Sequence, residues 1–445
     1  MDTPICDFVR RYAESGVSRL HMPGHKGSSF LGCEEWDVTE ISGADSLYEA
    51  SGIIAASENN AAALFGSART LYSAEGSSQC VRAMLYLALL NAPQNGKRPF
   101  VLAARNAHKS FVLGAALLDL DVEWLWPEGE NFSLCSCGVS PQGLEKTLDS
   151  MSDKPAAVYI TSPDYLGGML DVGAIADACH RHGVPLLVDN AHGAYLHFLP
   201  RRAHPLDLGA DMCCDSAHKT LPVLTGGAYL HISKTAPEVF SENARRAMAL
   251  FGSTSPSYLI LQSLDLANAY IAGDYAARLA KCAEHIDGVK AELGANGWEV
   301  YQSDPLKITV GTAGRTEYAA GLLRRNGVEF EYADPDYIVM MATPENREED
   351  FTRILSALGC PPPVKSAAVQ RPRLPMPQRR MSIRRAVLSP QENVAAEEAA
   401  GRILASPAVS CPPAVSVLVS GEEISREAVE IMAYYGARSI SVVRD

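Results

Sequence analysis

Apolar runs of strand length alternate with segments of helical spacing through the first part of the chain. The strand-like runs lie at residues 99–105, 122–126, 156–163, 185–188, 212–215 and 226–233, and the segments at 108–120, 141–151 and 172–183 have helical spacing. Such alternation is typical of a mostly parallel sheet with helices on both faces. The pattern therefore predicts an α/β major domain, and we see no internal repeat.

The N-terminal part has fewer strand signals. Helical spacing runs from Pro4 to Glu14 and returns near residues 58–64, with the loop HMPGHKG between them. A Gly-Ser-Ser sequence at Gly76, Ser77 and Ser78 then opens a strongly apolar helix that continues through Leu90. By itself this tripeptide is more often a plain helix cap than a binding site.

The pattern changes after Ser257, where long helices and then a mixture of short strands and two helices follow. We predict four parts: residues 1–275 as the major domain, 276–360 as a small α+β domain, 361–385 as a linker, and 386–445 as a C-terminal α/β unit. The linker is rich in proline and arginine, which usually marks a solvated segment. In the last unit we expect a helix near 390–404, a strand at 414–420, and a final helix and strand.

Composition limits the classes of function. The chain has 445 residues with 47% hydrophobic and 20% charged, which is ordinary for a globular protein. A net charge of −13 argues against nonspecific nucleic-acid binding and suits a cationic small molecule. No run approaches the roughly 20 apolar residues that span a bilayer, and the N-terminus lacks a signal-peptide pattern. Eleven cysteines without a CxxC pair indicate reduced thiols in the cytoplasm.

Two of the apolar runs end in residues that can carry proton chemistry. Asp189 follows the run from Pro185, and the run from Met212 delivers Ser216, His218 and Lys219. Parallel strands bring their carboxyl ends to one edge of a sheet, where open α/β sheets bind ligands. A lysine and a carboxylate at that edge suit pyridoxal phosphate, which needs an amine for its aldehyde and a carboxylate beside its ring nitrogen.

Five motifs occur in the order known from one family. They are HMPGHKGSSF from His21, RNAHKSF from Arg105, VDNAHGAY from Val188, DSAHKTLPVLT from Asp215 and STSPSYLILQSLD from Ser253. Together they resemble the ornithine/lysine/arginine decarboxylase family of aminotransferase-like, fold type I pyridoxal-phosphate enzymes. The resemblance covers nearly the whole chain, and it implies decarboxylation of a basic amino acid to an amine and CO₂ in polyamine metabolism.

The resemblance also implies roles for the residues around the cofactor ring. Lys219 matches the lysine that holds the cofactor aldehyde, and Asp189 would keep the ring nitrogen protonated so that the ring withdraws electrons. Ala191 would let the ring lie flat on one face, while His108 matches the histidine that stacks on the other. Taken alone, Asp189 and His108 also suit helix caps, and His192 in the same motif is either a cofactor contact or structural.

The cofactor phosphate needs hydrogen-bond donors at the other end of the site. The N-terminus of the helix opened by Gly76, Ser77 and Ser78 offers backbone N–H groups and a favourable dipole. Ser216 and His218 match family phosphate contacts, and Thr254 and Ser255 match contacts that come from a neighbouring subunit. The resemblance thus implies a homodimer with composite active sites and possibly a higher assembly. The histidine spacing gives no reason to expect a metal.

Departures from the family pattern leave the substrate open. Asn190 replaces a commonly acidic residue, Tyr195 replaces a frequent histidine, and Thr225 begins a sequence where a glutamine is usual. Asp45 and Glu49 lie in an acidic loop that either meets the distal cation of the substrate or is solvated, and His21 and His25 form a lid or an exposed loop. Alternatives are a related pyridoxal-phosphate aminotransferase or lyase, and a cofactor-binding regulatory protein without turnover.

Overall fold

The computed structural model describes residues 1–93, 96–128, 133–302, 304–361, 376–407 and 415–444. The chain forms two compact units, and each is continuous in space but not in sequence. The first unit contains residues 1–99, 145–162 and 171–278, and the second contains 100–144, 163–170 and 279–445. The predicted division into four parts is a separate hypothesis that this grouping does not test.

Seven strands form one sheet in the order β1-β7-β6-β5-β4-β2-β3. Neighbours β2 and β3, β4 and β5, and β5 and β6 are parallel, whereas β7 runs antiparallel to β6 and to β1. The mostly parallel α/β fold is therefore confirmed. The strands are β1 (Arg69–Ser73), β2 (Phe100–Ala104), β3 (Asp121–Leu125), β4 (Ala157–Thr161), β5 (Leu186–Asp189), β6 (Met212–Asp215) and β7 (Ala228–Ile232).

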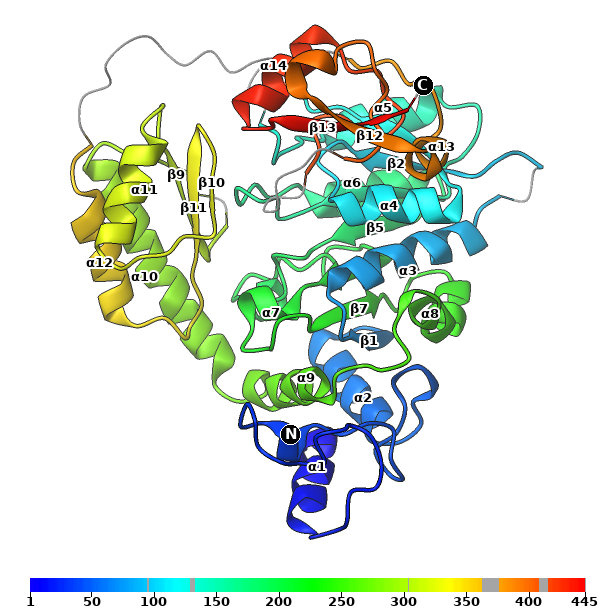
Figure 1. Cartoon of the computed structure of the whole chain (residues 1–445), viewed down its shortest axis with the longest axis vertical. Coiled ribbons are helices and arrows are strands. Elements are labelled where there is room, and N and C mark those ends of the chain that lie inside the picture. Colours follow the sequence, from blue (N-terminus) through cyan, green and yellow to red (C-terminus); the bar gives the residue numbers. More distant parts are fainter. Residues whose placement is uncertain (94–95, 129–132, 303, 362–375, 408–414, 445) are drawn as a thin grey trace. The chain divides into compact units, whose positions relative to one another are not determined.

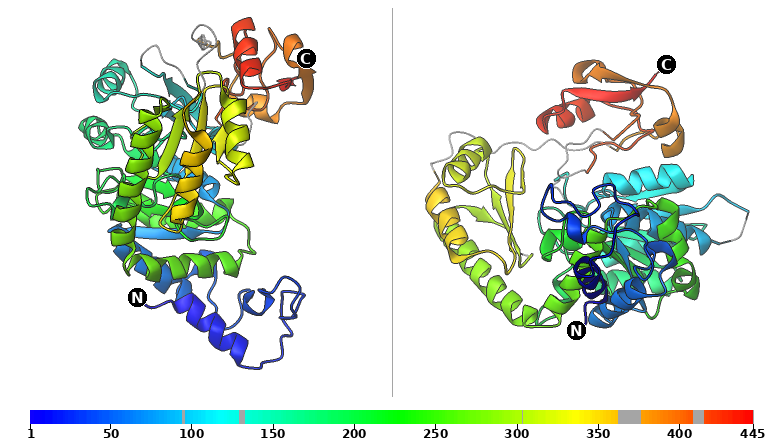
Figure 2. Two further views of the ribbon diagram at one scale, coloured as in Figure 1. Left: turned by 90° about the vertical axis from the view of Figure 1, so that its left-hand side faces the viewer. Right: turned by 60° about the horizontal axis from the view of Figure 1, so that its bottom comes forward.

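Helices cover the strands of the first unit. In Figure 1, α3 lies across β1 and β7, and it packs against β6 as well. Figure 1 and the left view of Figure 2 place α1 and the loop after it beyond α9, at the outer end of this unit. The helices are α1 (Pro4–Glu14), α2 (Ile53–Phe65), α3 (Ser77–Leu90), α6 (Val172–Arg181), α7 (Ala217–Thr220), α8 (Glu238–Phe251) and α9 (Tyr258–Ile271).

The second unit contains an antiparallel sheet in the order β10-β11-β9-β8 and a two-stranded ribbon of β12 and β13. The strands of this sheet and ribbon are β8 (Glu299–Val300), β9 (Lys307–Gly311), β10 (Tyr332–Ala333), β11 (Tyr337–Met341), β12 (Gln391–Ala395) and β13 (Ser439–Val443), and β2 and β3 of the seven-stranded sheet also fall within this unit. Its helices are α4 (Lys109–Leu118), α11 (Thr316–Arg325), α12 (Glu348–Leu358), α13 (Ile383–Leu388) and α14 (Arg426–Tyr434), while α5 (Pro141–Ser150) and α10 (Tyr275–Ala295) belong to both units. No helix in the described ranges is both long enough and apolar enough to span a bilayer.

Two elements predicted in the last part of the chain are wrong. Instead of a helix near 390–404, β12 pairs with β13, which is distant in sequence, and a short 3₁₀ turn at Ala396–Glu398 follows. The predicted strand at 414–420 makes only an isolated bridge through Val415 in its described residues, 415–420. Val415, Val417 and Leu418 are instead buried in the core around α14, so their hydrophobicity reflects packing in an irregular segment. The final helix and strand are confirmed as α14 and β13.

The predicted linker is only partly described, because residues 362–375 lie outside the described ranges. Within the remainder, α13 already begins at Ile383. Three arginines of this basic stretch contact the second unit: Arg380 pairs with Glu423, Arg384 with Asp119, and Arg379 donates to the carbonyl of Val122. This end of the stretch is therefore attached to the fold, contrary to the expectation of a solvated segment.

A buried ion pair joins the end of β2 to the C-terminal part of the same unit. Arg105 donates to both carboxylate oxygens of Glu422, at 3.0 and 2.7 Å, and both side chains are buried. The guanidinium carbon also lies 5.0 and 4.9 Å from the ring centres of Trp124 and Trp126. The bidentate geometry and the two indole rings compensate for the removal of this pair from water.

We expect Glu422→Gln to lower the free energy of unfolding by about 3 kcal/mol, because it leaves the buried charge of Arg105 without a counterion. Glu423 is the matched control, since it is the next residue and its partner Arg380 is about half exposed. For Glu423→Gln we expect a loss below about 1 kcal/mol. Chemical denaturation monitored by tryptophan fluorescence measures both values, and equal losses for the two variants would contradict the prediction.

Candidate active site

The two predicted strand ends lie side by side in the first unit. β5 ends at Asp189 and β6 ends at Asp215, and the parallel register sets Asp189 opposite Cys214. Four residues after the end of β6, Lys219 lies in the short helix α7, whose N-cap is Ser216. The lysine and the carboxylate therefore come from neighbouring strands at one edge of the sheet, as the sequence predicts.

Asp189 is held by hydrogen bonds from its own turn and from β4. The Tyr159 hydroxyl donates to Oδ2 at 3.0 Å, and the backbone N–H of Ala191 donates to Oδ1 at 3.2 Å. Burial and the neighbouring charge of Asp189 raise the pKa of Tyr159 well above its usual value, so the phenol keeps its proton and remains a donor. The Asp189 carboxylate thus has a fixed orientation, with only 3% of the residue exposed.

Tyr159 was not predicted as a site residue. The only signal in the sequence is a phenol within the apolar run of β4, and such a residue is usually part of the core. Only the order of the strands places it beside Asp189, because β4 pairs with β5.

The amine of Lys219 meets the turn that follows Asp189. Its Nζ lies 3.0 Å from Nε2 of His192, a buried side chain. Ala191, between Asp189 and His192, is also buried and has a side chain too small to cover the carboxylate. His192 is therefore in direct contact with the lysine, and its contact with the cofactor stays a prediction.

Four of the predicted phosphate contacts also lie close together. Gly76 caps α3 with a φ of 72°, a conformation that glycine adopts without strain, and Ser77 begins the helix. The Ser216 hydroxyl donates to the Ser77 hydroxyl at 2.8 Å, which joins the N-terminus of α3 to the end of β6. Ser78 follows in the first turn of α3, whose leading N–H groups have no acceptor within a helix. A helix N-terminus with hydroxyls beside it suits a phosphate.

His218 and the loop around Thr254 lie near these residues in the chain fold. Nδ1 of His218 donates to the carbonyl of Gly227 at 2.9 Å, which fixes the ring against the turn before β7. Thr254 and Ser255 are exposed in the loop between α8 and α9. The N–H of Ser253 in that loop donates to Glu75, the residue before Gly76. The loop is therefore tied to the start of α3 in its own chain.

His108 belongs to the second unit and is the N-cap of α4, where its Nδ1 accepts a hydrogen bond from the N–H of Ser110 at 3.1 Å. This contact is the helix-cap role that the sequence also allowed, and stacking on the cofactor stays a prediction.

Asp45 is a backbone ligand in the structure. It accepts N–H groups of Ser46, Ser51, Gly52 and Ile54, around the start of α2. Burial acts to raise the pKa of Asp45, but these backbone hydrogen bonds outweigh it, and the pKa lies below its usual value. In the HMPGHKG loop, His25 contacts Asp37 at 3.2 Å and His21 contacts Tyr12. These side chains therefore have structural partners within the first unit.

The residues of the first unit fit pyridoxal phosphate by their chemistry. An amine, a buried carboxylate whose orientation is fixed, and a helix N-terminus with two serine hydroxyls lie at the carboxyl ends of β5 and β6 or at the start of α3. These are the three kinds of group needed for the aldehyde, the ring nitrogen and the phosphate of the cofactor. Lys219, Asp189, Ser77, Ser78 and Ser216 would hold it.

Comparison with known proteins agrees with this chemistry. A family model described as Orn/Lys/Arg decarboxylase, major domain, matches residues 3–312, and one for the C-terminal domain matches residues 365–440. The chain is 28% identical to YaaO of Bacillus subtilis, over 97% of this chain and 93% of YaaO. It is also 28% identical to an arginine decarboxylase of Halalkalibacterium halodurans, over 95% of this chain and 91% of that enzyme.

Among solved structures, the lysine decarboxylase LdcF of Francisella novicida has the same fold, with a TM-score of 0.80 at 18% identity, covering 99% of this chain and 81% of LdcF. The match to the major-domain model extends over more than half of the chain, and pyridoxal phosphate is the cofactor of that family. The chain belongs to the Orn/Lys/Arg decarboxylase family and is an amino-acid decarboxylase.

Proposed function

We propose that this enzyme removes the α-carboxylate of a basic amino acid, namely arginine, lysine or ornithine, and releases the corresponding amine and CO₂. The observation that carries the proposal is the position of Asp189 at the end of β5 and of Lys219 shortly after the neighbouring β6, in a chain of this family. The curated relatives that act on arginine make arginine the first substrate to test. The net charge of −13 favours the approach of a cationic substrate.

Each predicted residue has a proposed task. The bound cofactor supplies an electron sink for the negative charge that develops at the α-carbon when CO₂ leaves. The Asp189 carboxylate, oriented by Tyr159, holds a proton on the ring nitrogen. The Lys219 amine binds the cofactor covalently and later moves a proton at Nζ, next to Nε2 of His192. Ala191 leaves room for one ring face, and His108 covers the other.

A second group of residues is proposed to bind the cofactor phosphate, and part of this group comes from the partner subunit. Gly76, Ser77, Ser78, Ser216 and His218 anchor the phosphate, and Thr254 and Ser255 contact it in the partner subunit of a homodimer. The exposure of these last two residues, and of the large apolar side chains of Leu20, Phe30 and Leu31, supports an interface. Sedimentation equilibrium tests this assembly, and a monomeric mass at micromolar concentration would contradict it.

The product amine would enter polyamine metabolism. The ten free cysteines of the described ranges support a location in a reducing compartment such as the cytoplasm.

Incubation of the enzyme with pyridoxal phosphate and arginine, lysine, ornithine or a panel of neutral amino acids tests the reaction. We expect CO₂ and one amine product from a basic amino acid. Release from none of the three would refute the proposal, and a keto-acid product would indicate an aminotransferase instead.

A further inference from the structure

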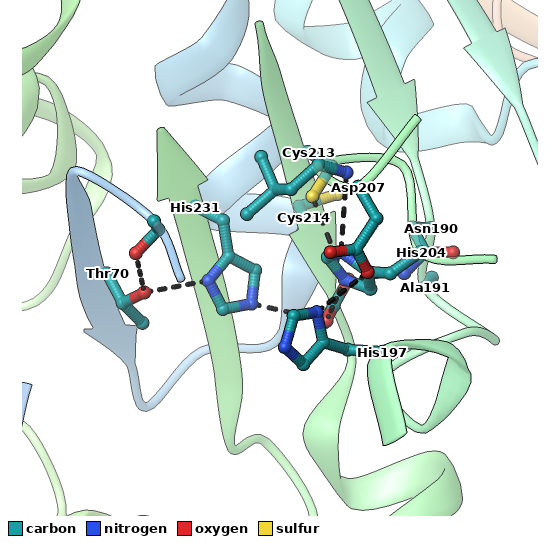
Figure 3. A network of polar contacts seen from close by, with 12 residues as sticks. Thr70, Asn190, Ala191, His197, His204, Asp207, Cys213, Cys214 and His231 are labelled. Atoms are coloured by element: carbon teal, nitrogen blue, oxygen red, sulfur yellow. Dashed lines mark hydrogen bonds and ion pairs between the residues drawn. The ribbon is translucent and has the colours of Figure 1, made fainter. Parts of the chain in front are cut away.

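A buried polar cluster lies where β5 and β6 end, beneath the residues described above. Its centre is Asp215, the last residue of β6, whose side chain has 0% exposure. The Asp215 carboxylate contacts Nδ2 of Asn190 at 2.7 Å, Nε2 of His204 at 3.0 Å and Nε2 of His231 at 3.2 Å. Figure 3 shows His204 and His231 converging, with Asn190 on the neighbouring turn and the His197 and Asp207 pair beside them.

The protons in this cluster can be assigned from its outer contacts. The N–H of Leu206 donates to Nδ1 of His204, so the proton of that ring is on Nε2 and points to Asp215. The Asp215 carboxylate accepts from Nε2 of His231 as well, which leaves Nδ1 of that ring facing the Thr70 hydroxyl at 2.8 Å, and burial lowers the pKa of His231 below its usual value. Burial acts to raise the pKa of Asp215, but the two histidines outweigh it and keep it below its usual value.

The cluster is therefore one buried negative charge with three N–H donors. Two imidazoles and a carboxylate are also the donor types of a metal site, and their ligating atoms lie within 4.8 Å of one another. In the proton arrangement above, however, the nitrogens that would bind the metal already carry hydrogens. A hydrogen-bonded cluster is therefore the better description of these contacts.

Asn190 connects this charge to the cofactor-holding turn. It follows Asp189 directly and precedes Ala191 and His192, so its amide fixes the turn between the carboxylate and the histidine. The turn is closely packed, because a Cβ on Gly193 would lie 2.1 Å from Oδ1 of Asn190. An aspartate at position 190 would bring two carboxylates together in a fully buried site, which is strongly unfavourable. The amide at 190 and the carboxylate at 215 are thus chemically complementary.

We propose that Asp215 is a positioning residue that, through Asn190, fixes the two strand ends carrying Asp189 and Lys219 in their relative places. The proposal rests on the proposed function, because it takes these two residues as the ones that hold the cofactor. Asp215 itself touches neither of them in the contacts above. It acts by locking the turn after β5 to the residue from which the chain continues into Ser216 and α7.

The other end of the same strand offers a matched control. Asp211, just before β6, is also buried, accepts the N–H of Leu186 at 2.8 Å and contacts Nε2 of His180 at 2.9 Å. It therefore ties the start of β5 to the start of β6, as Asp215 ties their ends. Asp211→Asn should weaken the fold by a comparable interaction but leave the cofactor end undisturbed.

The test compares Asn190→Asp, Asp215→Asn, the double variant with both changes, and Asp211→Asn. For Asn190→Asp we expect turnover to fall about 10²-fold, the effect of a misplacement of about 1 Å. Asp215→Asn should lose less activity, because the side-chain amide of Asn190 can flip. The double variant should recover most of the turnover, since an asparagine at 215 can donate to an aspartate at 190 while its carbonyl accepts both histidines.

Three kinds of measurement are made on all four variants. Thermal unfolding of the apoproteins gives their stability, visible absorbance and the rate of dissociation report on the bound cofactor, and steady-state kinetics gives kcat and KM separately. We expect altered absorbance and faster cofactor loss in Asp215→Asn but not in Asp211→Asn. Equal effects of these two variants, or a double variant no better than Asn190→Asp, would overturn the proposal. So would stoichiometric divalent metal in the purified wild-type protein. If the wild-type enzyme released no CO₂, the proposed function would fail, and the cofactor measurements would still decide the role of Asp215.

Discussion

Lys219→Ala is expected to lower decarboxylation by at least about 10³-fold, because one side chain holds the cofactor aldehyde and moves a proton. Positioned proton transfer alone contributes about 10²- to 10⁴-fold, and loss of the covalent bond adds to it. The structure supports both roles of this side chain, since Lys219 follows the end of β6 and its Nζ lies 3.0 Å from Nε2 of His192. Single-turnover assays with saturating cofactor measure the loss without a contribution from weak cofactor binding.

Lys234 provides the control for this prediction. It follows β7 on the surface of the same unit, and Lys234→Ala should retain full activity. Borohydride reduction followed by peptide mass spectrometry gives a second readout that does not depend on turnover. The cofactor should be attached to the peptide containing Lys219 in the wild-type enzyme and in Lys234→Ala. Attachment to another lysine, or full activity of Lys219→Ala, would refute the role.

Asp189→Asn is expected to reduce kcat by about 10²- to 10³-fold, which is the range for removing one preorganised electrostatic group. The substitution keeps the shape of the side chain and its contact distance to the N–H of Ala191, but it removes the charge that would hold a proton on the ring nitrogen. The loss should appear in kcat more than in KM, because the charge matters most when the α-carbon becomes negative. Steady-state kinetics with the best basic amino acid measures both constants.

Tyr159→Phe gives a graded comparison for Asp189. It keeps the ring within the core but removes the hydroxyl that donates to Oδ2 at 3.0 Å. A hydrogen bond to a charged group contributes about 1.5 to 3 kcal/mol, and we expect the lower end of this range, a decrease of about 10-fold in kcat, because the N–H of Ala191 still holds the carboxylate. A Tyr159→Phe loss as large as that of Asp189→Asn would mean that orientation, rather than charge, is what the carboxylate supplies.

The structure explains one of the three departures from the family pattern and leaves the other two without an explanation. Asn190 has a clear reason, because its amide donates to the buried carboxylate of Asp215. Tyr195 is fully buried in the first unit and Thr225 is exposed, and nothing in the described contacts links either residue to substrate choice. The oxygens of Asp45 accept backbone N–H groups, which favours a structural role for Asp45, and the acidic residue that would bind the distal cation stays open.

Local sequence signals predicted the central strands and the helices between them because buried parallel strands are continuous apolar runs. Met212–Asp215 was predicted without error, and β5 differs from its predicted run by one residue at each end. The same signal failed at 414–420, whose described residues 415–420 are buried without forming a strand, and at Gln391–Ala395, where a short polar segment pairs with β13. Strand pairing with a distant segment leaves no periodic pattern when one strand is short and partly exposed.

The sequence by itself determined the α/β class, the family, the cofactor, and the arrival of Asp189 and Lys219 at strand ends, because each depends on short motifs or on local apolar runs. Only the tertiary structure decided which groups surround them. Tyr159 reaches Asp189 across 30 positions in sequence, Asn190 meets Asp215 across 25, and Arg105 pairs with Glu422 across 317. These contacts follow from strand order, register and burial, which place side chains together without any local pattern to mark them.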